Sequence, residues 1–592
     1  TNKAAEEMRS RLADQLGDRA AEVRVGTFHS VCLEFLRAWA KESDISATFT
    51  LATPDDLDHI IRTVWQDDTF SQRRNRLDRI SKWKGHGHTE ELPEEVMQYN
   101  RMLRKYGLLD FDDIIFEALK LLRASGIFKL KLHQTYRRIF VDEYQDINAA
   151  QHDLLVELVQ YGVHLTAIGD PNQAIYGFRG AESKFFSTFS DDFPDAKVLY
   201  LSENYRSAPT ILNASSQVIS SAEINGRPVV PPLVPALYME GRLTIHEAAT
   251  ERAEAEYVVR QIERLVGGTS MFSQDSGRVK NDAAAERSFG DVAVLYRINS
   301  LHTSLEEAFQ RSGIPYHITG DKALIEQPAV MEIATLLRLA QGMNVTTGSV
   351  MRLLGSLVEG VGEKTTEQID ALWRQRSQVS LDHIRALPEQ KRVLSDRSKE
   401  GLQVLIQDIR TITAHLRVSD IATAVKHVPV LSVWDTLQRV YTSVEDSLQK
   451  LMRIARLETD TTAYLDNLLL SRSYDPIGAV SEHVSLMTLH AAKGLEFPVV
   501  FIVGCENELL PLQYPGMGKD REEERRLFYV GMTRAKEQLY FVRVKNRMLF
   551  GSTYQTYPSP FLADIEEQLK HYEQKEEKKI VRCSSRKFFS KF

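Results

Sequence analysis

The feature that most constrains the fold of this chain is a pair of short apolar runs, each followed by acidic residues. Residues 138–141 read Arg-Ile-Phe-Val and lead into Asp142 and Glu143, and residues 164–168 lead through a glycine into Asp170. A stretch with the periodicity of a helix separates the two runs. Alternating strands and helices are typical of a parallel sheet, in which functional groups gather at the carboxyl ends of the strands. The sequence therefore predicts an α/β fold with a polar site beyond these two strands.

A second α/β segment begins at about residue 210. Apolar β-type runs at 292–296, 484–487 and 499–503 predict three of its strands, whereas the chain from about 325 to 478 is helical in pattern. Residues 45–125 are likewise helical and rich in charge. We therefore expect each of the two α/β domains to carry a helical insertion.

Several shorter segments carry weaker patterns. Residues 3–16 have apolar side chains four apart and predict an amphipathic helix. Residues 23–29 predict a short strand and loop, followed by a helix through Trp39. Residues 267–288 are polar and aperiodic, which predicts a loop. The Glu- and Lys-rich stretch 566–592 predicts a charged tail, either a solvated helix or a frayed end.

Length, cysteine usage and charge limit the class of protein. A chain of 592 residues is too long for one core, and at about 100–200 residues per domain it predicts about three to five domains. No run of about 18 uncharged apolar residues occurs, so no membrane partner is expected. Three scattered cysteines exclude a disulfide framework and suit the cytoplasm. A net charge of −7 argues against coating nucleic acid by charge alone, but it allows a DNA groove built on base stacking and local cations.

The side chains that follow the two predicted strands suit a particular chemistry. Phosphoryl transfer needs one carboxylate to hold Mg²⁺ and a second group to orient the attacking water, and Asp142 and Glu143 offer both, although a surface loop would carry the same pair. After the second strand, Tyr176, Phe178 and Arg179 place two rings and a guanidinium on one short element. They suit either core packing or a platform for single-stranded bases, where stacking contributes about 1–3 kcal/mol per base.

Together these segments resemble the motor motifs of UvrD/Rep/PcrA-type superfamily 1 DNA helicases. The resemblance runs along nearly the whole chain in the order of the family. The segments that resemble the family's motifs are Ia at residues 1–8, Ib at 26–30, II at 142–146, III at 169–180, IV at 203–207, V at 488–497 and VI at 523–535. Any one motif is moderate evidence, whereas seven in order are specific.

The resemblance implies roles around bound ATP for residues of the first α/β segment. Asp142 would hold Mg²⁺, and Glu143 would position or activate the attacking water. Gln173 would report on the γ-phosphate.

Residues of motifs IV to VI would complete the nucleotide site. Arg206 and Arg534 would approach the γ-phosphate as arginine fingers, because a guanidinium stays charged and binds phosphate oxygens in pairs. Tyr205 would stack on the adenine, and Glu496 would contact the ribose. A surface ion pair is the plain alternative for either arginine, and a core position for the tyrosine.

The resemblance also implies a path for DNA. Phe28, His29, Tyr176 and Phe178 would meet the single strand, with Arg179 beside them. Phe178 stands where the family has tryptophan; a phenyl ring keeps a π-face, so stacking should survive with less area. The alternative for His29 is a partly buried histidine with a structural role only.

A glycine pair in the second helical insertion resembles the family's duplex-contacting hairpin. Gly360 and Gly362 precede a predicted helix, where backbone N–H groups can approach a phosphate. A Gly-Val-Gly sequence is weak evidence, and a plain loop is an equal alternative.

The family's phosphate-binding loop, Gly-x-x-x-x-Gly-Lys-Ser/Thr, is expected upstream of motif Ia. The chain begins within motif Ia, and its only Gly-Lys pair, Gly518-Lys519, follows no strand and precedes Asp520 instead of a hydroxyl residue. The family's adenine-reading glutamine motif is missing as well. We therefore expect a sequence truncated at its start and inactive as an ATPase on its own. A natural ATP-independent protein is the alternative.

The resemblance implies an α/β fold with two RecA-like P-loop NTPase motor domains, each with a parallel sheet and a helical insertion. The expected boundaries are residues 1–44 and 126–209 for the first motor domain, 45–125 for its insertion, 210–324 and 479–565 for the second motor domain, 325–478 for its insertion, and 566–592 for the tail.

The implied function is that of an ATP-dependent 3′→5′ DNA helicase. It would use ATP and Mg²⁺, bind single-stranded DNA and single-strand/duplex junctions, and unwind duplex DNA in repair, recombination or replication. Repair or replication proteins are candidate partners, and a bacterial cytoplasm with its nucleoid is the expected location. Two rivals stay open: a non-catalytic DNA-binding module, and the helicase subunit of a nuclease or defence complex.

Overall fold

The computed structural model divides the chain into two compact units, each made of two stretches of sequence. Unit 1 comprises Thr1–Ala196 and Gly320–Ala479, and unit 2 comprises Lys197–Thr319 and Val480–Phe592. The structure describes residues 2–573 except for 44, 88–91, 161, 183, 222–230, 238, 268–286, 320–323, 328, 344, 374–375, 377, 391–392, 419, 443, 457, 459, 471–481, 514–519 and 550–551.

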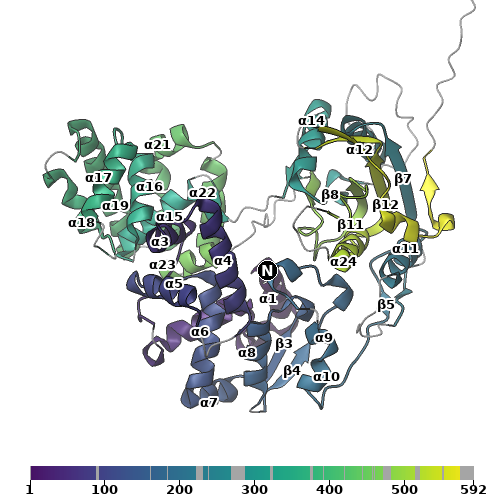
Figure 1. The fold of residues 1–592 in the computed structure, drawn as a ribbon, viewed down its shortest axis with the longest axis horizontal. Coiled ribbons are helices and arrows are strands. Elements are labelled where there is room, and N and C mark those ends of the chain that lie inside the picture. Colours follow the sequence, from purple (N-terminus) through teal and green to yellow (C-terminus); the bar gives the residue numbers. More distant parts are fainter. Residues whose placement is uncertain are drawn as a thin grey trace, which may run out of the picture. The chain divides into compact units, whose positions relative to one another are not determined.

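Unit 1 is mostly helical (Figure 1). The elements of its first stretch are α1 (Asn2–Leu16), α2 (Phe28–Ala38), β1 (Thr50–Leu51), α3 (Pro54–Val64), α4 (Phe70–Gly85), α5 (Glu94–Lys105), β2 (Leu108–Leu109), α6 (Phe111–Ala124), α7 (Gly126–Thr135), β3 (Arg138–Val141), α8 (Ala149–Val159), β4 (His164–Ala167), α9 (Lys184–Ser187) and α10 (Phe189–Asp192). Those of its second stretch are α15 (Val330–Gln341), α16 (Thr347–Leu357), α17 (Glu363–Trp373), α18 (Leu381–Arg385), α19 (Asp396–Val418), α20 (Ile421–Lys426), α21 (Val433–Val440), α22 (Val444–Ala455) and α23 (Thr461–Leu470).

The two strands predicted from the apolar runs form the parallel pair β3–β4. Their register runs from Arg138 opposite His164 to Val141 opposite Ala167, and α8 lies between them in the sequence. Parallel strands end at the same edge of a sheet, so the polar residues that follow each strand meet there. The Ile168 N–H donates to the Val141 carbonyl oxygen at 2.8 Å and extends this pairing beyond the strands. The prediction of neighbouring parallel strands is confirmed.

The start of the chain differs in part from its prediction. The helix expected at 3–16 is α1, and the one expected through Trp39 is α2. Residues 23–27 form no strand, because the chain turns into α2 instead: Thr27 caps the helix by accepting a hydrogen bond from the Ser30 N–H. His29 therefore lies in the first turn of a helix and not in a loop.

The two helical segments of unit 1 pack on each other through a buried polar cluster. Asp56 on α3 is fully buried and pairs with Arg338 on α15 at 2.8 Å. The same carboxylate accepts hydrogen bonds from Thr346 Oγ1 at 2.6 Å and Ser349 Oγ at 2.7 Å. Such a charge is tolerated in a protein interior because every lone pair has a donor. The helical character predicted for 45–125 and 325–478 is confirmed for the described residues of these ranges, while the boundaries of motor domains and insertions stay a prediction.

Unit 2 is an α/β unit built from both of its stretches. Its elements are β5 (Glu203–Asn204), α11 (Pro209–Ser220), β6 (Val234–Pro235), β7 (Arg242–Ala248), α12 (Glu251–Leu265), β8 (Val292–Tyr296), α14 (His302–Ser312), β9 (Tyr316–Ile318), β10 (Val484–Thr488), β11 (Phe497–Val503), α24 (Arg521–Met532), β12 (Ala535–Val544), β13 (Asn546–Leu549), β14 (Ser552–Gln555) and β15 (His571–Tyr572).

Seven strands of unit 2 form one parallel sheet in the order β15-β7-β12-β11-β8-β10-β9. Alternate side chains of β11 face opposite sides of this sheet. Val499, Phe501 and Val503 pack into the core under α12 and α14, whereas Ile502 reaches Gly531 on α24. Helices therefore cover both faces (Figure 1), which explains why the strands read as continuous apolar runs.

Two predictions concern segments near the edges of unit 2. The charge pattern beyond 565 predicted a helix or frayed tail, but His571 and Tyr572 instead pair with β7 as the edge strand β15. Residues 574–592 and most of the loop predicted at 267–288 lie outside the described residues. No helix in the described part of the chain is long and apolar enough to cross a membrane.

Candidate functional site

Two carboxylates emerge from the end of β3 in unit 1. The Glu143 N–H donates to Asp142 Oδ1 at 3.0 Å, and Glu143 has a φ of 53°, in the left-handed region. A residue other than glycine held there costs about 1–3 kcal/mol, and such backbone strain concentrates at functional sites. The structure therefore places both predicted carboxylates at the end of β3, where the backbone of Glu143 is strained.

The loop after β4 brings a third predicted residue to the same edge. Asp170 accepts from the Asn172 N–H through Oδ1 and from Gln173 Nε2 through Oδ2, both at 2.9 Å. The loop is joined to motif II by the Tyr144 N–H, which donates to the Ile168 carbonyl oxygen at 2.9 Å. Asp142, Glu143 and Gln173 thus share one strand edge, as the sequence predicted.

The carboxylates at this edge are of the kind that bind Mg²⁺ at nucleotide sites. Within the described residues no group of three or more His, Cys, Asp or Glu is placed to hold a metal ion. Mg²⁺ at nucleotide sites is held by one or two carboxylates together with phosphate oxygens and waters. Asp142 supplies a carboxylate of this kind, and its role as a ligand stays a prediction.

The aromatic residues predicted to meet DNA are exposed to different degrees. Phe178 is 58 % exposed, and its ring lies 6.1 Å from that of the half-buried Tyr176, at an interplanar angle of 57°. The His29 ring lies against that of Phe111, with centroids 3.7 Å apart and an interplanar angle of 31°, and Phe28 is half-buried against two cores. Phe178 is therefore the ring best placed to accept a base. The side chain of Arg179 lies outside the described residues.

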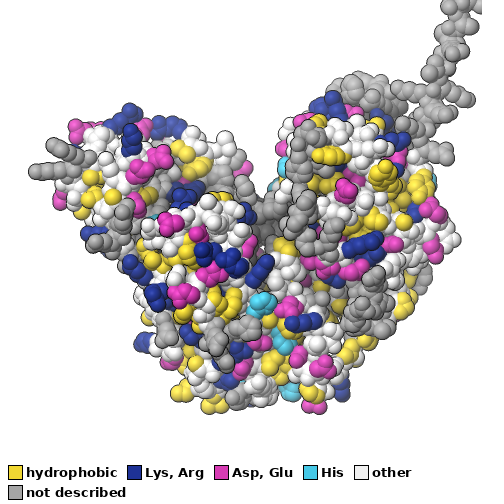
Figure 2. All heavy atoms as spheres, viewed as in Figure 1, with side chains coloured by type: hydrophobic (Ala, Val, Ile, Leu, Met, Phe, Trp, Pro, Cys, Tyr) yellow, Lys and Arg dark blue, Asp and Glu magenta, His cyan; other side chains and the backbone are white. Residues whose placement is uncertain are grey.

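Charge on the visible surface is mixed. On the face drawn in Figure 2, Lys and Arg side chains are interspersed with Asp and Glu over both units. This mixed distribution agrees with the net charge of −7.

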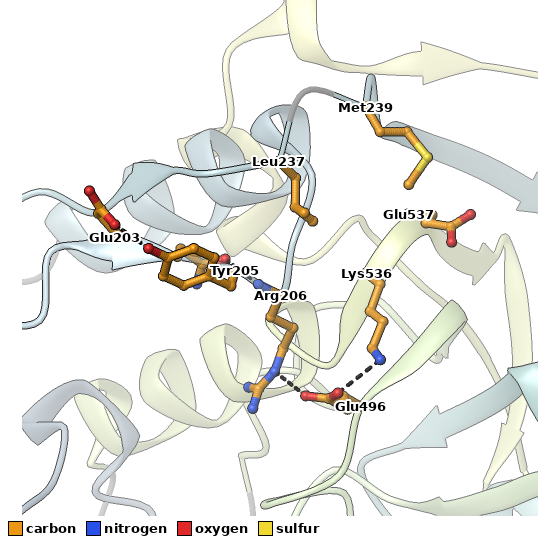
Figure 3. Close-up of a pocket in the computed structure, with 9 residues that line it drawn as sticks. Glu203, Tyr205, Arg206, Leu237, Met239, Glu496, Lys536 and Glu537 are labelled. Carbon is orange, nitrogen blue, oxygen red and sulfur yellow. Dashed lines mark hydrogen bonds and ion pairs between the residues drawn. The ribbon is translucent and has the colours of Figure 1, made fainter.

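A pocket in unit 2 gathers the predicted residues of motifs IV and V. It has a volume of about 650 Å³ and lies at the amino ends of β11 and β12 (Figure 3). Its lining residues are Glu203, Asn204, Tyr205, Arg206, Leu237, Met239, Glu496, Lys536 and Glu537.

Hydrogen bonds fix motif IV against the first residues of β12. The Ser207 hydroxyl donates to the Ala535 carbonyl oxygen at 2.7 Å, and the Ala208 N–H donates to the Lys536 carbonyl oxygen at 2.8 Å. Asn204 Oδ1 accepts from the Arg206 and Ser207 N–H groups at 3.1 and 2.9 Å and closes a tight turn. The turn presents the side chains on either side of it to the pocket.

Among the residues that line the pocket, one carboxylate pairs with two cations. Glu496 Oε2 lies 2.7 Å from Arg206 Nε, and Oε1 lies 2.8 Å from Lys536 Nζ, as the dashed lines in Figure 3 mark. The hydrogen bond from Lys536 lowers the pKa of Glu496, and Arg206 lowers it further although partial burial raises it. Glu496 is therefore an ionised anchor for the arginine that the sequence assigned to the γ-phosphate. Lys536 carries no motif signal, and sequence reasoning missed it.

Tyr205 offers its ring to the pocket. The residue is 69 % exposed, and its hydroxyl donates to the Glu203 carboxylate, which raises the pKa of Tyr205. The apolar side chains of Leu237 and Met239 lie on the same pocket (Figure 3). The exposed Tyr205 ring, the apolar walls and the fixed Glu496 carboxylate suit a purine and a sugar. The pocket has three carboxylates and only two cations, so its charge does not suit a triphosphate alone.

Arg534 lies between α24 and β12 and is only 1 % exposed. Its Nε donates to the Val530 carbonyl oxygen at 3.0 Å, its Nη1 to the Leu495 carbonyl oxygen and its Nη2 to Thr533 Oγ1, both at 3.1 Å. The guanidinium is thus next to the backbone that carries Glu496, but it does not line the pocket in this structure. Contact with a phosphate stays a prediction that requires this side chain to turn.

The glycine pair lies in unit 1, before α17. Gly360 has a φ of 81°, and a Cβ there would lie 2.8 Å from Ser398 Oγ, so the turn requires glycine. Gly362 directly precedes Glu363, the first residue of α17. The geometry explains Gly360 by local packing, and duplex contact stays a prediction.

Comparison with known proteins gives consistent results for both halves of the chain. Residues 1–194 match the model of the UvrD/REP helicase N-terminal domain, and residues 199–546 match that of the UvrD-like helicase C-terminal domain. The ATP-dependent DNA helicase PcrA of Staphylococcus epidermidis is 31 % identical over 627 aligned residues, which cover 100 % of this chain and 83 % of the relative. The PcrA of Staphylococcus aureus is 31 % identical over 604, which cover 96 % and 79 %.

A weaker match comes from solved structures. The C-terminal domain of a possible DNA helicase from a Lactobacillus aligns with a TM-score of 0.23 and 12 % identity, over 63 % of this chain and 99 % of that one. A likeness of this size has no bearing on fold or function.

Proposed function

Because the chain belongs to the UvrD/REP family of DNA helicases, we propose that it moves 3′→5′ along single-stranded DNA and separates duplex DNA with energy from ATP hydrolysis. Its two α/β parts are RecA-like motor domains. Changes in the nucleotide site of such a motor are transmitted as domain movements that advance the strand.

The observation that carries this proposal is the strand edge after β3. It presents Asp142 and the strained Glu143 next to the loop that holds Gln173. Asp142 would hold Mg²⁺ on the nucleotide, Glu143 would orient water, and Gln173 would sense the γ-phosphate. Positioning and charge stabilisation supply most of the catalysis in phosphoryl transfer, which is what such an edge provides.

The pocket of unit 2 supports a second part of the proposal. Tyr205 would stack on the adenine, and Glu496 would accept a hydrogen bond from the sugar. Arg206 is held by Glu496 through Nε, and Figure 3 shows its two terminal nitrogens directed away from that bond. These two nitrogens match two phosphate oxygens, so the anchored arginine would meet the γ-phosphate without losing its partner.

Single-stranded DNA would cross the loop that follows β4. Phe178 presents more than half of its surface to solvent, and Tyr176 lies against it. Rings of this kind accept bases of any sequence, as a translocating motor requires. Work on chromosomal DNA would place the protein at the nucleoid.

The 592 residues contain no Gly-x-x-x-x-Gly-Lys-Ser/Thr loop. That loop holds the β- and γ-phosphates in line with water, and orientation is worth about 7–11 kcal/mol in reactions of this type. We therefore propose that a polypeptide limited to residues 1–592 binds DNA but hydrolyses ATP poorly.

Phosphate release by the full natural protein tests the proposal. Oligo-dT should stimulate ATP hydrolysis, and Glu143→Gln should abolish it. Glu157→Gln is the control, because Glu157 lies in the same unit and pairs with Lys129 at 2.7 Å, away from the strand edge. Hydrolysis that ignores oligo-dT, or that survives Glu143→Gln, would overturn the proposal.

A further inference from the structure

Gln145 joins the two polar loops of unit 1 and has no role assigned so far. The residue is 1 % exposed. Its Nε2 donates to Glu143 Oε2, and its Oε1 accepts from the Asp170 N–H at 3.1 Å. The amide orientation follows from chemistry, because a carboxylate only accepts and a backbone N–H only donates. A single side chain therefore ties motif II to motif III.

The space around this amide is closed. A Cβ at Gly169 would lie 2.2 Å from Gln145 Oε1 and 2.9 Å from Phe186 Cε2, so only glycine fits there. The φ of Gly169 does not require glycine; the close approach of the buried amide does. Gly169 thus leaves the room that the buried Gln145 amide occupies, and hydrogen bonds to both loops hold the amide there.

The bridge continues to the predicted phosphate sensor. Asp170, whose N–H is held by Gln145, accepts from Gln173 Nε2 through its own carboxylate at 2.9 Å. Two residues therefore connect the carboxylate of Glu143 with the amide of Gln173. A movement of Gln173 would shift Asp170 and, through it, the donor that holds Glu143.

We propose that Gln145 is a positioning residue, which fixes the Glu143 carboxylate for the attacking water and couples its orientation to Gln173. This role rests on the proposed ATP hydrolysis. The hydrogen bond restricts rotation of a carboxylate whose backbone is already strained. A misplacement of about 1 Å costs as much as about 10²-fold in rate, so a single donor at this point matters for turnover.

The test is steady-state hydrolysis by the full natural protein with and without oligo-dT. Gln145→Leu removes both hydrogen bonds at similar size. It should lower kcat by about 10–100-fold and weaken the stimulation by oligo-dT, while the Kd of a non-hydrolysable ATP analogue changes less than about threefold. Gln151→Leu is the control: Gln151 in the same unit accepts from the Asn148 N–H at 3.0 Å, and its loss should leave kcat unchanged.

A second variant covers the case in which Gln145→Leu does not fold. Gln145→Glu keeps the shape and the acceptor for Asp170, but places a second carboxylate against Glu143. Its kcat relative to wild type should recover as the pH is lowered, because the introduced carboxyl becomes a donor once protonated. A merely structural role would show no such pH dependence.

A double-mutant cycle with Gln173→Ala completes the test. If Gln145 acts between Glu143 and Gln173, the two substitutions are not additive in kcat. Additive effects, or a wild-type kcat in folded Gln145→Leu, would overturn the role of Gln145. A wild-type protein without DNA-stimulated hydrolysis would overturn the proposed function itself, and this role with it.

Discussion

Replacing Phe178 with alanine removes the aromatic ring best placed for a base. The residue is 58 % exposed, so less than half of its surface contributes to packing. Full burial of a phenylalanine is worth about 1.5–3 kcal/mol, so the fold should lose about 1 kcal/mol or less. Stacking of one base contributes about 1–3 kcal/mol, which predicts a rise in the Kd for single-stranded DNA of about 5- to 150-fold.

Fluorescence anisotropy of a labelled oligo-dT measures this change at a fixed salt concentration. Phe178→Trp should bind at least as tightly as wild type, because the indole ring offers a larger π-face. Phe70→Ala is the matched control, since Phe70 is 69 % exposed at the start of α4 and belongs to no motif. Equal Kd values for wild type and Phe178→Ala would refute the stacking role, and so would an equal loss in Phe70→Ala.

Three further predictions concern the nucleotide site and the helical segments. Arg534→Ala should lower kcat by about 10³-fold and change nucleotide affinity much less. Stopped-flow binding measures the affinity, and steady-state hydrolysis measures kcat. An unchanged kcat would show that this buried side chain has a structural role only. Lys536→Gln should raise KM for ATP about threefold by loosening Glu496, whereas Lys545→Gln, which breaks a 3.0 Å ion pair elsewhere in unit 2, should not. Burial raises the pKa of Asp56, but its ion pair with Arg338 and its hydroxyl donors lower it more, to about 2. Since this pKa lies below the ordinary 3.8, the carboxylate should stabilise the fold by about 2 kcal/mol above pH 4 and lose that contribution as the pH falls through 2. Urea titrations at several pH values measure this loss. Asp56→Asn should be less stable than wild type by about 3–5 kcal/mol at neutral pH and should show no such loss at low pH.

The elements of the fold that could be predicted are those with a strong local pattern. The run at 292–296 became β8 because burial on both faces leaves an uninterrupted apolar sequence. The run at 138–141 became β3 although Phe140 is 66 % exposed, so its short apolar pattern was sufficient without burial on both faces. The strand expected at 23–29 failed because a cap decides the local structure there: Thr27 starts a helix that includes the apolar residues after it. Period and polarity alone do not distinguish these two outcomes.

Contacts between distant residues left no trace in the sequence. Asp56 and Arg338 are 282 positions apart, and each would pass as a surface charge on its own helix. The pairing of His571 and Tyr572 with β7 is similar, because a two-residue edge strand has too little pattern to detect. Tertiary packing, and not the local sequence, decides such positions.

The candidate site also has features that could be predicted from the sequence and features that could not. Asp142 and Glu143 could be predicted because a strand delivers them, and the structure places them at one edge with Gln173. The burial of Arg534 and the anchoring of Arg206 by Glu496 could not be predicted, because both depend on backbone and side chains from other motifs. A motif gives the residue types of a site, whereas its hydrogen bonds follow from the packing.

Strand separation by the full natural protein tests the central claim most directly. Wild type, ATP and Mg²⁺ should release the labelled strand from a duplex with a 3′ single-stranded tail, and a blunt duplex or one with a 5′ tail should stay paired. Glu143→Gln should bind the tailed duplex but release no strand. Release that needs no ATP, release that continues in Glu143→Gln, or release from the 5′-tailed duplex alone would contradict the account.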